Sequence, residues 1–85
     1  PTYADVAPIV AKRCAVCHAA NPTQSGFTAA PAGVLLDTPL NVRANAARVD
    51  AQAVATHAMP LGNLTNMTDA ERATLGAWVR AGANI

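Results

Sequence analysis

The sequence predicts a small all-α domain, with one helix near each end and short helices and loops between them. Two observations carry this prediction. Apolar residues recur with helical spacing near both ends of the chain, and no segment shows the apolar and polar alternation of a surface strand. The length of 85 residues corresponds to one domain, so residues 1–85 are expected to share one core.

The first helix is expected from about Val6 to about Cys14. Asp5 is a suitable N-cap, and Pro8 would fall in the first turn, where its missing N–H has no intrahelical partner. The apolar residues follow the spacing i, i+3 and i+4, at Val6, Ile9 and Val10. The helix would therefore lead directly into the five residues that follow.

Those five residues, Cys14-Ala15-Val16-Cys17-His18, match the C-x-x-C-H attachment signature of a c-type haem. In such a site both thiols are bonded covalently to the porphyrin and the histidine ligates the iron. A bare C-x-x-C is also compatible with a redox dithiol, a zinc module that would add His57, or a strained disulfide. The adjoining His18 favours one covalent haem c.

Residues 19–33 have the composition of a loop, rich in proline and glycine. We expect this loop to supply a backbone carbonyl to the free ring N–H of His18, which would orient the imidazole. Pro31 is the preferred candidate and Pro22 the alternative, although both prolines would also simply stiffen the loop. Residues 34–36 should run extended against the haem.

Thr38 and Pro39 fit the N-cap and first position of a second helix. The alanine-rich sequence that follows, as far as Thr56, predicts either two short helices or one bent helix. Arg43 and Arg48 lie in this region. Either arginine is a candidate partner for a haem propionate, and Arg48 is preferred, with an ordinary surface position as the alternative for both.

The segment around Met59 and Pro60 interrupts the helices and can face the second side of the haem. A methionine thioether is a soft, neutral iron ligand, and His/Met ligation raises the reduction potential. Met59 is the preferred sixth ligand because Pro60 stiffens its loop. Met67 is more typical of an apolar plug, while His57 would give bis-histidine ligation; an open position is the fourth possibility.

The last helix is predicted to begin with the capping box Thr68-Asp69-Ala70-Glu71 and to end before Gly82. Trp78, on the apolar face of this helix, should pack against the first helix. We also expect Trp78 to contact the cofactor. Gly76 would permit a close approach of those two helices. Arg72 and Arg80 are expected on a solvated face.

Composition limits the function. The net charge of +1 and the 13% of charged residues predict no nucleic-acid partner, and no apolar run is long enough to insert in a membrane. Hydrophobic residues make up 52% of the chain, but alanine dominates them, so a haem is expected to supply bulk that the core lacks and the apoprotein to fold poorly. Because the chain begins at Pro1, we expect a processed protein or a domain excised from a larger membrane-bound chain.

With these motifs in place, the chain resembles the monohaem class I cytochromes c. The resemblance rests on the C-x-x-C-H motif after a helix, on Met59-Pro60, and on Leu75-Gly76-Ala77-Trp78-Val79-Arg80-Ala81-Gly82 in the closing helix. It implies crossed terminal helices, with short helices and loops around one covalent haem. More narrowly, residues 9–14 and 57–68 are similar to the C-terminal cytochrome domain of bacterial membrane-bound urate hydroxylases.

That resemblance implies electron transfer rather than catalysis by the domain itself. Electrons would pass from an attached membrane domain that oxidises urate, in purine degradation, to a downstream cytochrome or oxidase of the respiratory chain. The domain would lie on the periplasmic side of the bacterial inner membrane. The alternatives are a free periplasmic electron carrier and a haem peroxidase or gas-binding domain with a labile distal ligand. Low charge favours a tethered domain, because electrostatic steering would be weak.

Overall fold

The computed structural model describes all 85 residues, and the chain is all-α, without strands. The longest helix, α4, has 12 residues, and no helix combines the length and hydropathy that crossing a bilayer requires. The α-helices are α1 (Tyr3–Arg13), α2 (Pro39–Ala44), α3 (Ala46–Val49) and α4 (Asp69–Arg80). Three further short helical segments lie between them: η1 (Pro31–Gly33), η2 (Asp50–Val54) and η3 (Leu61–Asn63), of which η2 is a π-helix.

Helix α1 begins three residues earlier than the sequence predicts, and its cap is Thr2 rather than Asp5. The N–H of Thr2 donates to the Asp5 carboxylate over 2.8 Å, which places Asp5 in the first turn. Pro8 therefore lies inside the helix, where its lack of an N–H removes one intrahelical hydrogen bond. Both expectations were wrong because Thr2 and Asp5 form a capping box one turn earlier.

Helix α4 begins and ends as predicted. The Thr68 hydroxyl accepts from the N–H of Glu71 over 3.1 Å, and the Glu71 carboxylate accepts from the N–H of Thr68 over 2.9 Å. At the other end Gly82 has a φ of +110°, and the N–H of Ala83 donates to the Trp78 carbonyl over 3.0 Å. This pattern is the Schellman motif, in which a left-handed residue closes the helix.

The middle of the chain forms two short helices separated at Asn45. Thr38 caps α2 through the N–H of Asn41 (3.1 Å), and Pro39 is the first helical residue, as predicted. Asn45 leaves the helical region of backbone space, and its side-chain amide donates to the carbonyls of Asn41 (2.9 Å) and Leu35 (3.2 Å). The chain then continues as α3 and, without a break, as η2.

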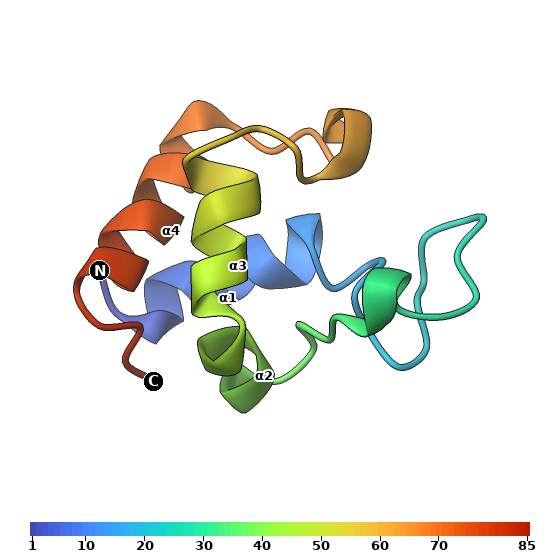
Figure 1. The fold of residues 1–85 in the computed structure, drawn as a ribbon, viewed down its shortest axis with the longest axis horizontal. Helices are drawn as coiled ribbons and strands as arrows, with labels where there is room; N and C mark the ends of the chain where they lie inside the picture. Colours follow the sequence, from blue (N-terminus) through green and yellow to red (C-terminus); the bar gives the residue numbers. More distant parts are fainter.

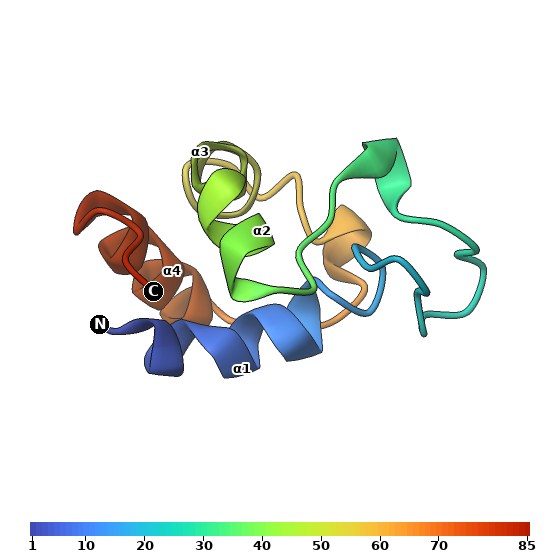
Figure 2. The same ribbon diagram turned by 90° about the horizontal axis from the view of Figure 1, so that it is seen from below.

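Helices α1 and α4 are in contact, and their axes are inclined to each other (Figures 1 and 2). The rings of Tyr3, near the start of α1, and Trp78, near the end of α4, have centroids 5.7 Å apart. At the opposite ends, Arg13 Nε lies 3.0 Å from the Glu71 carboxylate. Helices α3 and η2 also contact α4, so α4 lies against α1 as well as against α3 and η2. Residues 19–30 project away from the helices in both views (Figures 1 and 2).

The core is formed mainly by medium and large side chains, with one alanine. It joins α1 and α4 to α2, α3 and the segments beside them, and its members are Val6, Ile9, Val10, Leu36, Val42, Val49, Met67, Leu75, Trp78 and Ala83. Gly76 does permit a close approach, but of η2 rather than of α1, since a Cβ at Gly76 would meet Val54.

Arg72 contradicts the expectation of a solvated face, because it is only 6% exposed. Arg80 is exposed, as expected. Arg72 is buried because η2 packs on α4 at this position. The sequence pattern does not reveal this packing, so Arg72 and Arg80, eight residues apart, look alike in the sequence.

Candidate functional site

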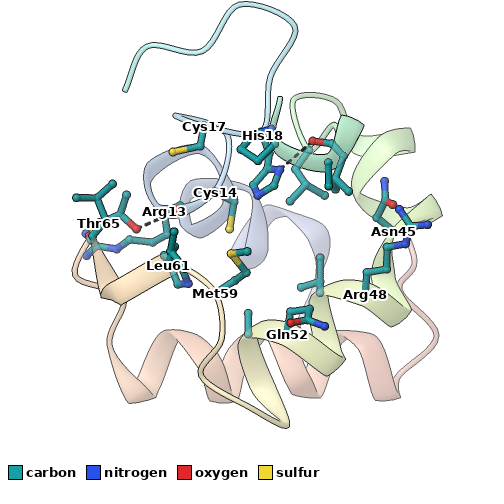
Figure 3. Close-up of a pocket in the computed structure, with 18 of the residues that line it drawn as sticks. Arg13, Cys14, Cys17, His18, Asn45, Arg48, Gln52, Met59, Leu61 and Thr65 are labelled. Carbon is teal, nitrogen blue, oxygen red and sulfur yellow. Dashed lines mark hydrogen bonds between the residues drawn. The ribbon is translucent and has the colours of Figure 1, made fainter. Parts of the chain in front are cut away.

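One cavity of about 490 Å³ collects nearly all the residues that the sequence singled out (Figure 3). Its volume lies in the range of roughly 300–1,000 Å³ typical of small-molecule and cofactor sites. Most of the wall is hydrophobic, and it is contributed by the end of α1, by residues 31–36, by α3 and η2, and by the loop from Met59 to Thr65.

The C-x-x-C-H motif continues the helical path of α1. The N–H groups of Cys14 and His18 donate to the carbonyls of Val10 and Cys14, both over 2.9 Å, and the N–H of Cys17 donates to Cys14 over 3.1 Å. This turn brings Cys14, Cys17 and His18 to the same cavity, which agrees with the spacing argument.

Cys14 and Cys17 are not joined by a disulfide. Burial, assisted by the nearby Cys17 and Glu71, raises the pKa of Cys14 to about 11. Burial also raises the pKa of Cys17. A reactive dithiol needs the opposite shift, whereas an uncharged thioether can be buried without the cost of burying a charge.

A backbone carbonyl orients His18, but it belongs to Val34 and not to Pro31 or Pro22. His18 Nδ1 lies 2.9 Å from the Val34 oxygen. A carbonyl only accepts, so Nδ1 carries the proton and Nε2 keeps its lone pair for a ligand. The prediction of Pro31 was wrong because the Pro31 carbonyl accepts from the N–H of Val34 to close η1. Pro31 does line the cavity.

Of the three candidates for a second axial ligand, only Met59 lines the cavity. Its side chain enters from a different wall than the ring of His18 (Figure 3). Met67 is 4% exposed and belongs to the core, and His57 is exposed outside the cavity. The side chain of Asn63 stabilises its own loop: its amide oxygen accepts from the N–H of Met67 over 2.9 Å, and its amide nitrogen donates to the Met67 carbonyl over 3.2 Å.

Three polar side chains of the wall, Asn45, Arg48 and Gln52, come from α3 and its flanks (Figure 3). Arg48 is exposed at the rim and has no acidic partner within 4 Å. Its position is suited to an anionic group at the cavity mouth. Arg43, the other candidate, is exposed and lies outside the cavity.

Trp78 does not belong to this site. It is 1% exposed, packs against Tyr3 in the core, and donates its indole N–H to the Asn84 carbonyl over 2.8 Å. The expected contact with the cofactor was therefore wrong, and the packing between the last helix and the first is what the structure shows.

Two arginines that the sequence did not connect with the site support its walls. Arg13 lines the cavity and bonds to Glu71 and to the carbonyl of Thr65. Arg72 lies behind the wall and donates to the carbonyls of Ala53 and Met59. No local signal marks these roles, because each contact joins residues at least 13 positions apart.

The donor set and the apolar wall fit a c-type haem: Cys14 and Cys17 could form its thioether bonds, and His18 and Met59 could bind its iron. The three residues of the zinc alternative are not brought together, since His57 lies outside the cavity. Comparison with models of protein families, with curated proteins and with solved structures found no match to this chain.

Proposed function

We propose that this chain is a one-electron-transfer domain of the class I cytochrome c kind, with one covalent haem c. The observation that carries the proposal is the meeting of four side chains, Cys14, Cys17, His18 and Met59, in one largely apolar cavity. Helix α1 delivers three of them in a single turn, and the fourth arrives from a loop more than forty residues later.

Bound haem supplies an iron that alternates between ferric and ferrous states. The residues of this chain prepare the site for that exchange. Val34 holds His18 with Nε2 free, and Met59 offers a neutral sulfur, so these two side chains would hold the iron. No substrate then needs to reach the iron, and the domain acts as an electron carrier rather than as a catalyst. The surrounding apolar wall lowers the local dielectric and favours the less charged, reduced state.

A peroxidase or gas-binding function is the alternative, and it requires Met59 to leave. The backbone contacts of Met59 are against this alternative. Its N–H donates to the Gln52 carbonyl over 2.7 Å, and its carbonyl accepts from Arg72 over 2.8 Å. With its backbone held on both sides, Met59 can leave only by rotation of its side chain and not by movement of the loop.

The wider proposal places the domain on the periplasmic side of a bacterial inner membrane. There it would pass electrons from an attached urate-oxidising domain to a downstream cytochrome or oxidase; a free periplasmic carrier is the alternative. The support is the sequence similarity of residues 9–14 and 57–68 and the small net charge of +1. Reduction of the haem by urate in the full-length membrane protein, but not in the separate domain, is the expected result.

The absorption spectrum of the haem-loaded protein tests the central proposal. We expect the sharp reduced bands of a c-type haem and a far-red sulfur-to-iron band in the ferric protein. Met59→Ala should abolish the far-red band. Met67→Ala should keep it while lowering the free energy of unfolding by about 2–5 kcal/mol, because Met67 fills the core. A far-red band that survives in Met59→Ala would refute the ligand assignment.

A further inference from the structure

We infer that Arg72 is a positioning residue for Met59, an inference that rests on the electron-transfer site proposed above. Its Nη1 donates to two carbonyl oxygens, those of Met59 and Ala53, each over 2.8 Å. Both of these residues line the cavity. Arg72 therefore ties the loop of Met59 and the π-helix η2 to α4 from behind the wall.

The hydrogen bonds around Met59 show what this contact does. The N–H of Met59 donates to the Gln52 carbonyl over 2.7 Å, so η2 holds one side of the residue. Arg72 holds the other side through the Met59 carbonyl. With both backbone polar groups engaged, the side chain is the only part of Met59 left to move, and it projects into the cavity (Figure 3).

The charge of Arg72 is also unusual. Arg72 is only 6% exposed, yet the only ion pair in the structure joins Arg13 to Glu71, so Arg72 has no acidic partner within 4 Å. The protons of its Nη1 are accepted by two backbone carbonyls. A buried cation without a counter-ion is costly and acts over a longer range than a screened one.

Two consequences follow for an iron in this site. Loss of the Met59 contact should let an external ligand compete more easily with the thioether. Loss of the positive charge should stabilise the ferric state relative to the ferrous state, and so lower the reduction potential. A lysine would keep the charge but not the fixed geometry of the guanidinium, which separates the two effects.

The experiment measures imidazole binding to the ferric haem protein and its reduction potential. Arg72→Met should bind imidazole about tenfold more tightly, as expected for one lost charge-assisted hydrogen bond, and should have a lower potential. Arg72→Lys should also bind imidazole more tightly but keep a potential near that of the original protein. Arg80→Met, an exposed charge on the same helix, is the control and should change neither quantity.

Imidazole affinity that is unchanged in both Arg72 variants would overturn the inference. If Arg72→Met fails to retain haem, Arg72→Lys alone decides, because it preserves the buried charge and most of the volume. Failure of the proposed function looks different: the original protein would then lack the far-red sulfur-to-iron band before any arginine is changed.

Discussion

The packing of α4 on η2 depends on the absence of a side chain at Gly76. A Cβ built there lies 2.7 Å from Val54 Cγ1 and 3.0 Å from Arg80 Nη1. The guanidinium of Arg80 can move, because it is the end of a flexible side chain. The Val54 methyl cannot easily do so, because a β-branched residue in a helix has one favoured rotamer. The two helices would have to separate.

The magnitude of Gly76→Ala follows from two opposing effects. Alanine gains about 1 kcal/mol of helix propensity over glycine in a helix interior. Overpacking of this kind costs roughly 1–3 kcal/mol. We therefore expect the free energy of unfolding of the haem-loaded protein to fall by about 1 kcal/mol, measured by denaturant titration.

Removal of the opposing methyl separates the two effects. In a Val54→Ala background the clash disappears, so Gly76→Ala should instead stabilise the protein by about 1 kcal/mol. The double-mutant cycle thus predicts a change of sign. Stabilisation by Gly76→Ala in the original sequence would refute the reasoning, since it would mean that η2 yields without cost.

Two further predictions concern the start of α4. Thr68→Ala should lower the free energy of unfolding by about 1 kcal/mol through loss of the N-cap, whereas Thr74→Ala, in the helix interior, should cause no loss; equal effects would contradict the capping argument. Burial alone would raise the pKa of the Glu71 carboxyl, but hydrogen bonds from Thr68 and Arg13 hold this pKa below its ordinary value. Glu71→Gln should therefore lower the free energy of unfolding by about 0.5–1 kcal/mol near pH 7. The difference between the two proteins should shrink as the pH falls below about 4.3, towards the folded-state pKa. A difference that grows in acid would show that the ionised carboxylate is not its source.

Local chemistry explains which parts of the fold the sequence could predict. The cap at Thr38 and Pro39, the box at Thr68 and Glu71, and the stop at Gly82 each need only neighbouring residues, and all three are confirmed. The start of α1 was missed because Thr2 and Asp5 both have the chemistry of a cap, and the pattern of apolar residues does not choose between them.

The contacts that complete the site are long-range, and the sequence does not reveal them. The carbonyl that orients His18 was expected from residues 19–33 but comes from Val34, just beyond them, and the residue that supplies it depends on how η1 closes. The burial of Arg72 depends on η2 lying against α4. An arginine eight residues before the exposed Arg80 looks equally solvated until the partner helix is in place.

These long-range contacts give the two sides of the cavity separate supports. His18 is held by Val34, which belongs to an extended segment outside the helical body. The loop of Met59 is held at one end by Arg72 and at the other by Arg13, whose guanidinium pairs with Glu71 and bonds to the carbonyl of Thr65. Adjacent residues of α4 thus fix both ends of the loop. Disturbance of the packing between α4 and η2 should therefore reach the methionine side of the site before the histidine side.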